Sequence, residues 1–315
     1  MPSQVIPRYR PIEFDRYITP DGNVYNFENA YDQFLISGIS GQGLPPVNYR
    51  TQRGPFQDGV TPLGFVLGSR TVILTHRRNT GCRDEYWGAR ADFMNFIRPN
   101  RQVVGEFTPG TLRREEPNGA KRDLCVFILS GPDFIGTQQG RWDEFNFQEI
   151  ITFVAHDPLF FDPDQQLLDL LLPASGDELD FPITFPIRFS SDGGVPLDTL
   201  TYNGTYKSFP IIIIQGPIKN PVITNVTTNE RIELETTILT GRTVTINLGF
   251  GNKTVVDDLG TNLIGELTTD SDLAEWHIAA DPEAPGGVNR IGTGGSGAGV
   301  PTRIAIQWFE RFIGI

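Results

Sequence analysis

Four consecutive isoleucines, Ile211–Ile214, constrain the fold of this chain more than any other feature. A strand with one solvated face alternates apolar and polar side chains, so this run predicts a strand that is covered on both faces. Pro210 before the run and Pro217 and Pro221 after it exclude a helix. Four residues are too few to cross a bilayer, and membrane insertion is not expected. The cover must come from a second layer of the same protein or from another subunit.

The composition predicts a mainly β protein of two domains. The chain has 315 residues, enough for two cores of ordinary size. It contains 34 glycines and 24 prolines, so turns are frequent and long helices are not expected. The opening MPSQVIPRYRPIEF has no apolar h-region, so a secretory signal is not expected, and no apolar run of membrane-spanning length occurs.

Charge divides the chain into two halves. Residues 1–155 hold 17 basic and 17 acidic side chains, whereas residues 156–315 hold 9 and 21, so the net charge of −12 comes from the second half. We expect a first domain over residues 1–160, a linker or seam over 161–180, and a second domain over 181–315. An acidic chain is a poor candidate for nucleic-acid binding.

Short strands are predicted along both halves. A hairpin around Asp21-Gly22 opens the chain, and residues 44–60 are expected to be an extended loop. Further strands are predicted at 71–75, 101–107, 111–115, 122–130, 142–155, 181–189, 209–215, 221–226, 231–235, 242–248, 253–256 and 302–310. The glycine-rich residues 292–297 are expected to be a flexible loop, and residues 270–277 are a candidate short helix.

One longer helix is predicted between Asp84, as its N-cap, and Pro99, which ends it. The apolar face that we expect to pack consists of Trp87, Phe93, Met94 and Ile97.

No catalytic, cofactor or metal site is predicted. His76, His156 and His277 lack partners at metal-ligand spacing, and His76 is expected to be a solvated strand end. Cys82 and Cys125 are expected to be buried, reduced thiols. The run Gly292–Gly297 matches a dinucleotide fingerprint by letters, but no helix follows it to receive a phosphate.

An excess of arginine lies in residues 50–122, which hold 13 basic and 7 acidic side chains. Arginine is favoured in protein interfaces because its planar group pairs with carboxylates through two hydrogen bonds. Codon usage in a GC-rich genome is the alternative explanation. The candidate subunit-interface residues are Arg50, Arg53, Arg70, Arg77 and Arg78.

The order of several segments resembles the distal tail protein family of long-tailed phages. In the first half these are LISGISGQGLPPVNYRTQRGPFQDG (35–59), TVILTH (71–76), NFIRPN (95–100), LRREEPNGAKRDLCVFI (112–128) and FVAHDPLFFDP (153–163). In the second half they are NGTYKSFPIIIIQGPIKNPVITNVTTNERIEL (203–234), GRTVTINLG (241–249) and IAIQWFERFIGI (304–315). The resemblance covers nearly the whole chain and depends on order and spacing.

The resemblance implies a tail-tube-like β-barrel or sandwich with one packed helix, followed by a galectin-like β-sandwich. It also implies a virion protein at the tail tip that forms a ring, usually a hexamer, between the tail tube protein and the hub or tip protein. DNA would pass through the bore without specific binding, and a receptor-binding protein is a further possible partner. Ile211–Ile214 would lie in the second sandwich, covered by its opposing sheet, with the other side closed by the seam or the first domain.

The alternative function is a host adhesin that binds carbohydrate through the second domain. Trp276 is the candidate ligand aromatic, with a core position as its other interpretation. Likeness of fold alone does not establish sugar binding.

Overall fold

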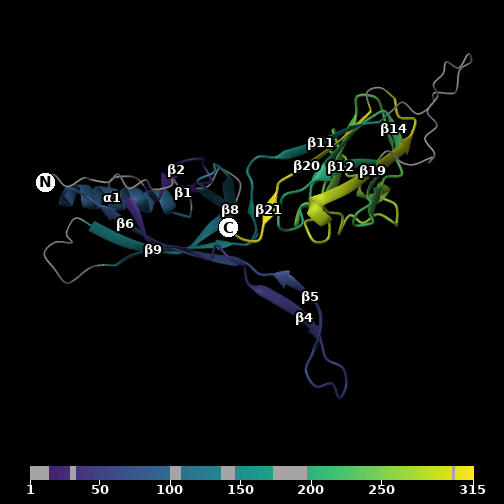
Figure 1. Cartoon of the computed structure of the whole chain (residues 1–315). Helices are drawn as coiled ribbons and strands as arrows, with labels where there is room; N and C mark the ends of the chain where they lie inside the picture. Colours follow the sequence, from purple (N-terminus) through teal and green to yellow (C-terminus); the bar gives the residue numbers. More distant parts are fainter. Residues whose placement is uncertain (1–13, 29–32, 100–107, 136–145, 173–196, 300–301) are drawn as a thin grey trace, which may run out of the picture. The chain divides into compact units, whose positions relative to one another are not determined.

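The computed structural model describes residues 14–28, 33–99, 108–135, 146–172, 197–299 and 302–315. The chain divides into two compact units (Figure 1). Unit 1 comprises residues 1–163 together with the last four residues, 312–315, and unit 2 comprises residues 164–311. The predicted strands at 101–107 and 181–189 lie outside the described residues.

Unit 1 is built on one antiparallel sheet, whose strands differ in length. Its main path is β2-β1-β7-β8-β9-β6-β3. The short strand β10 pairs with β8, and β21 pairs with β10. The strands are β1 (Phe14–Ile18), β2 (Val24–Asn26), β3 (Gln33–Ser40), β6 (Arg70–Asn79), β7 (Gly110–Glu115), β8 (Lys121–Ile135), β9 (Asn146–Ala155), β10 (Phe160–Phe161) and β21 (Arg311–Phe312). The predicted hairpin at Asp21-Gly22 joins β1 to β2, where Gly22 has a positive φ of 84° that suits glycine.

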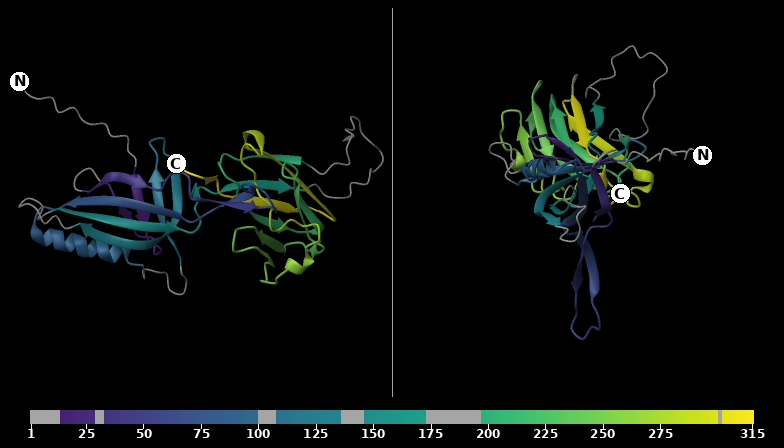
Figure 2. Two further views of the ribbon diagram at one scale, coloured as in Figure 1. Left: turned by 90° about the horizontal axis from the view of Figure 1, so that it is seen from below. Right: turned by 90° about the vertical axis from the view of Figure 1, so that its left-hand side faces the viewer.

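The α-helix of the described residues, α1 (Arg83–Ile97), covers one face of this sheet (Figure 2). Its buried residues are Ala89, Phe93 and Ile97. Phe93 and Ile97 join a core with Leu74 and Phe153. The predicted packing face was wrong at Trp87 and Met94, which are exposed, because the buried stripe follows the four-residue spacing 89-93-97. The predicted N-cap was also wrong: the N-cap is Cys82, without a side-chain capping bond, and Asp84 lies inside the first turn.

Unit 2 is a sandwich of two five-stranded antiparallel sheets, which confirms the predicted mainly β fold. One sheet has the order β11-β20-β13-β17-β18, and the other has β12-β19-β14-β15 with β16 beside β14. The strands are β11 (Gln166–Leu171), β12 (Leu197–Thr201), β13 (Ile211–Gln215), β14 (Ile218–Asn225), β15 (Glu230–Glu233), β16 (Thr237–Ile238), β17 (Thr243–Asn247), β18 (Thr254–Asp257), β19 (Val288–Ser296) and β20 (Arg303–Trp308).

The isoleucine run forms β13 at the centre of its sheet, between β20 and β17. Ile212 and Ile214 point into the core that the two sheets share, whereas Ile211 and Ile213 remain partly exposed. Cover is therefore complete on one face only. We expected the seam to cover the second face of β13. Residues 166–171 of that seam instead pair with β20 as an edge strand of the same sheet, so they do not lie over that face.

The predicted boundaries at 161–180 and 181–315 also need correction. Residues 166–171 are not a linker, because they form β11 and pair with β20 along its whole length. The chain's last residues are not part of unit 2, since Phe312 joins the core of unit 1 and the Ile315 amide donates to the Gln42 carbonyl. Leu171 is the last residue of β11, and residues 173–180 lie outside the described part of the chain.

The glycine-rich segment is also a correction, because it is the strand β19 rather than a loop. Its glycines allow close packing: a Cβ added at Gly295 would lie 2.6 Å from the Ile218 side chain, and one at Gly287, just before β19, would lie 1.9 Å from the Tyr202 carbonyl oxygen. The candidate helix at 270–277 is absent, and turns replace it.

Candidate assembly interface

A β-hairpin of unit 1 forms a sheet of its own. It consists of β4 (Val47–Gln52) and β5 (Thr61–Leu67), which pair with each other and with no other described strand. Figures 1 and 2 show this hairpin, which we call the arm, extending away from the rest of unit 1. The prediction of an extended loop over residues 44–60 was therefore wrong, since much of that segment is one strand of a hairpin and its turn.

The arm has one apolar face. Val47 lies opposite Leu67 and Tyr49 opposite Phe65, and residues that pair across antiparallel strands project on the same side. Tyr49 is 69% exposed and Phe65 is 53% exposed. Leu63, where the register shifts, is exposed as well. The opposite face carries Asn48, Val66, Arg50 and Gly64, so the apolar side chains lie mainly on one side.

Such an arm is not expected to be stable without a partner. A lone two-stranded hairpin is at best marginally stable in water, and a third strand or a packed layer is needed to bury its apolar face. Within the described residues neither β4 nor β5 has that cover, because only Val47 and Leu67, at the base, are partly buried. Exposed apolar surface of this kind marks a site of protein association.

The tip of the arm presents a second unusual feature. Phe56 is fully exposed and has a φ of 61°. A bulky side chain in the left-handed region is uncommon and costs conformational energy. Beside it the Arg53 Nε donates to the Gln57 carbonyl at 3.2 Å, so the guanidinium is held at the tip.

The candidate interface arginines occupy three different environments. Arg50 and Arg53 lie on the arm and are exposed, which suits a subunit contact. Arg77 and Arg78 lie at the end of β6 and are partly exposed, and their role in a subunit contact stays a prediction. Arg70 differs from the expectation because it is 1% exposed and serves the fold of its own unit.

Arg70 satisfies backbone carbonyls from three distant segments. Its guanidinium donates to the Pro158 carbonyl at 2.7 Å, to the Gly41 carbonyl at 2.6 Å, and to the carbonyls of Gly43 and Ile313. Burial lowers the pKa of Arg70. All four of these carbonyls belong to unit 1. Arg70 therefore ties the chain's last residues to the β3–β4 connection.

A groove lies between the end of β6 and α1. Its volume is about 520 Å³, and its lining residues are Arg78, Asn79, Thr80, Gly81, Glu85, Gly88, Ala89 and Asp92. A Cβ added at Gly88 would meet no atom within 4 Å, so the surface is open there. Cys82, next to the lining residue Gly81, is exposed, which corrects the expectation of a buried thiol. Cys125 is partly buried, and neither cysteine forms a disulfide.

A buried pair of hydrogen-bonded polar side chains lies beneath α1. His76 and Glu149 are both 0% exposed, with His76 Nδ1 and Glu149 Oε1 2.5 Å apart, and the His76 ring stacks on Phe93. The expectation that His76 is a solvated strand end was wrong, because its strand continues to Asn79 and α1 covers this part of it. Burial raises the pKa of Glu149, and the contact with His76 opposes part of that rise.

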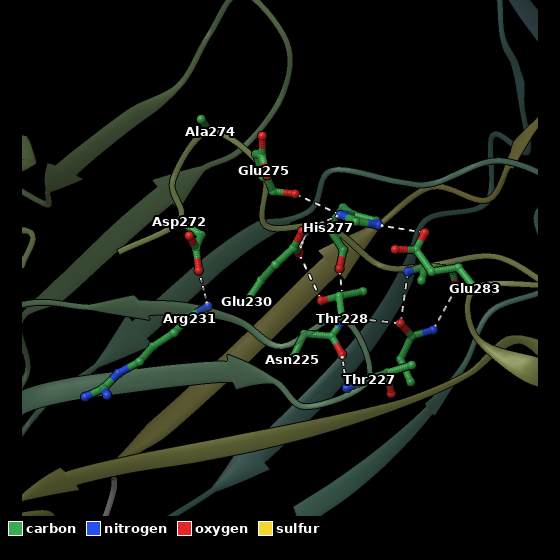
Figure 3. Close-up of polar contacts among 12 residues, drawn as sticks. Asn225, Thr227, Thr228, Glu230, Arg231, Asp272, Ala274, Glu275, His277 and Glu283 are labelled. Carbon is green, nitrogen blue, oxygen red and sulfur yellow. Dashed lines mark hydrogen bonds and ion pairs between the residues drawn. The ribbon is translucent and has the colours of Figure 1, made fainter. Parts of the chain in front are cut away.

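In unit 2 the candidate ligand aromatic is a core residue. Trp276 is 0% exposed and belongs to the hydrophobic core. A polar network fixes the adjacent backbone (Figure 3): the His277 amide donates to Glu230 at 2.9 Å, and the His277 ring lies 3.0 Å from Glu230 and 3.2 Å from Glu283. The sugar-stacking role predicted for Trp276 therefore fails, since no ring face is accessible.

The same network affects His277. Burial lowers the pKa of His277, but hydrogen bonds to Glu230, the Glu275 carbonyl and Glu283 outweigh it, and the pKa lies above its ordinary value. Asn225 donates to the His277 carbonyl (Figure 3). Asn289 completes the network by donating to the Ala279 carbonyl. These contacts hold a long connection against the sandwich.

Among the described residues, no group of three or more His, Cys, Asp or Glu side chains is placed to hold a metal ion. No helix in the described ranges has the length and apolar character needed to cross a membrane.

Two successive β units, one with a helix on its sheet and one a two-sheet sandwich, make up the described fold. The chain is similar in fold to the crystal structure of phage SPP1 Dit, with a TM-score of 0.61 and 11% identity. The similarity covers 96% of this chain and 99% of the SPP1 Dit chain. That protein is described as a paradigm of the hub of the adsorption apparatus in phages that infect Gram-positive hosts. The chain has the fold of the distal tail protein, and the predicted resemblance is confirmed at that level.

A weaker similarity, with a TM-score of 0.45 and 12% identity, relates 94% of the chain to 98% of a chain in the activated baseplate of phage P2 with Ca. No protein-family model matches the sequence, and neither does any curated protein.

The residues that sequence reasoning missed are the apolar side chains of the arm. Tyr49, Leu63 and Phe65 lie in a segment rich in glycine and proline, which usually indicates a loop. The available signal was the run Thr61–Leu67, whose odd-numbered residues Leu63, Phe65 and Leu67 alternate with smaller ones.

Proposed function

We propose that this chain is a structural protein of a long-tailed phage virion and forms a ring at the distal end of the tail. The ring joins the tail tube to the hub or tip of the baseplate, and DNA passes through its bore without specific binding. The observation that carries the proposal is the similarity to SPP1 Dit, which spans both units and nearly all of both chains.

The arm supports self-association. A ring grows through head-to-tail contacts, which require two different complementary patches on each subunit. The exposed apolar face at Tyr49 and Phe65 is one patch that needs a partner. The hexameric stoichiometry, the tail tube protein and hub protein as neighbours, and the virion location are parts of the same proposal.

The carbohydrate-binding alternative depended on an accessible Trp276, which the structure does not provide. Trp276 is enclosed in the core of unit 2, and no observation on the described residues replaces it. The proposed role is therefore structural.

Negative-stain electron microscopy combined with mass measurement of the purified chain tests the proposal. We expect rings with a central hole and a mass of several chains, six in the leading case. A monomer at all protein concentrations that also fails to join tail tube protein and hub protein when mixed with them would overturn it.

A further inference from the structure

We propose that the arm of one copy binds the groove between β6 and α1 of the next copy, with Phe56 and Arg53 of the arm tip in the groove. This inference rests on the proposed ring, and it names the two surfaces that meet. It is supported by three observations: the exposed tip of the arm, the open groove beside α1, and the opposite charges of the two surfaces.

The arm tip needs a pocket outside its own unit. Phe56 is fully exposed in an unfavourable backbone conformation, and a strained exposed aromatic is typical of a residue that binding holds in place. Figure 1 shows the arm and α1 extending in different directions from the sheet of unit 1. The arm therefore does not cover the groove of its own chain, and a second copy must supply the surface.

The groove has the shape that such a tip requires. It measures about 520 Å³, and Gly88 and Ala89 on α1 keep it open. No atom lies within 4 Å of a Cβ built at Gly88, so an aromatic ring can approach the helix there. Trp87, on the same helix, is 54% exposed and extends the apolar surface beside the groove.

The charges are complementary. Residues 47–67 carry Arg50 and Arg53 against a single acidic residue, Asp58. The groove is lined by the carboxylates of Glu85 and Asp92, with Arg78 as its basic residue. Glu85 accepts a hydrogen bond from the Gly81 amide, which leaves Asp92 as the carboxylate best suited to pair with an incoming Arg53.

The arm and groove also satisfy the requirement for two different patches. One chain carries both, so copies associate head to tail and close when the rotation allows. A partner of another sequence would leave every groove in the ring empty, whereas a second copy fills each groove with one arm.

Cysteine cross-linking in the full-length chain tests the contact, because Cys82 is exposed beside the groove. We expect the variant Phe56→Cys to form disulfide-linked dimers and higher species under mild oxidation. The double variant Phe56→Cys with Cys82→Ser should form none, since serine removes the receiving thiol and suits the N-cap position. A matched control is Leu259→Cys, which is 73% exposed in unit 2 and should not cross-link.

Charge reversal gives an independent measurement. Arg53→Glu and Asp92→Arg should each weaken self-association by about tenfold or more, and the double reversal should restore it. Circular dichroism should show unchanged folding for each variant because both positions are exposed.

The outcomes separate the two proposals. Rings that form without Phe56–Cys82 cross-links and without rescue by the double reversal would overturn this contact and leave the ring intact as a proposal. Cross-links that persist after Cys82→Ser would join the tip to a second tip or to Cys125, and either result would also overturn it. A chain that stays monomeric and joins no tail component would overturn the ring and the contact together.

Discussion

Arg70 donates a hydrogen bond to the carbonyl oxygen of Ile313, 243 positions further along the chain. The same guanidinium bonds Gly41, Gly43 and Pro158, and it lies 4.7 Å above the Phe160 ring. The last four residues are therefore an integral part of unit 1.

We predict that Arg70→Lys destabilises unit 1 by about 3 kcal/mol, because an ammonium group cannot replace the guanidinium fork and leaves buried carbonyls unpaired. Hydrogen exchange at the β6 and β9 amides measures this, with unit 2 amides as the internal reference. Arg53→Lys, at the exposed arm tip, is the matched control and should leave exchange unchanged. Equal protection in Arg70→Lys and the native chain would contradict a structural role for Arg70.

The sequence predicted the architecture well where local patterns decide it. Alternating apolar residues and turn signals located most strands of both units, and Asp21-Gly22 identified the first hairpin. The isoleucine run predicted a strand, and the structure places it as β13 between two neighbours. The outer face of β13 is partly exposed because β11 pairs at the edge of the same sheet and does not cover it. The sequence of β13 alone does not indicate where β11 pairs.

The environment of single polar residues could not be predicted in this way. His76 lies in a basic run, yet α1 and the partner Glu149, 73 positions away, bury it. Arg70 belonged to the same arginine-rich segment as Arg53, but the carbonyls that surround it come from three distant segments. Long-range contacts decide such cases, and composition does not distinguish them.

The His277 network predicts a dependence on pH. The folded pKa of His277 is raised, so its contribution to stability is complete below about pH 6.5 and is lost as the pH rises through the folded value. We expect the advantage of the native chain over His277→Gln to shrink with rising pH in the calorimetric transition of unit 2.

His156→Gln, at an exposed position in unit 1, serves as the control for the histidine substitution and should leave the unit 2 transition unchanged. A constant difference between the native chain and His277→Gln from pH 6 to pH 9 would contradict the proposed pairing with Glu230 and Glu283.

Trp276→Ala should destabilise unit 2 by about 3–5 kcal/mol, because a fully buried indole is removed from the core. Hydrogen exchange at the amides of unit 2, with the amides of unit 1 as the internal reference, measures the loss. Trp276→Phe should cost less, since most of the apolar contact remains. If Trp276 instead served a sugar site, Trp276→Phe would reduce binding on a glycan array and leave stability unchanged.

The apolar face of the arm gives the most direct test of assembly. We predict that Tyr49→Ser combined with Phe65→Thr abolishes ring formation and leaves the thermal stability of the monomer unchanged, because both side chains are exposed in the single chain. These side chains are expected to stabilise the assembled state. Their burial by a neighbouring subunit contributes about 25 cal/mol per Å² of apolar area removed from water. Sedimentation velocity of the variant against the native chain measures the effect.

Asn48→Ser combined with Val66→Thr, on the opposite face of the same strands, is the matched control and should assemble normally. Equal loss of assembly in both double variants would show that the arm needs its hairpin conformation rather than one apolar face. Normal assembly of the Tyr49 and Phe65 variant would mean that subunits associate through other surfaces of unit 1 or unit 2.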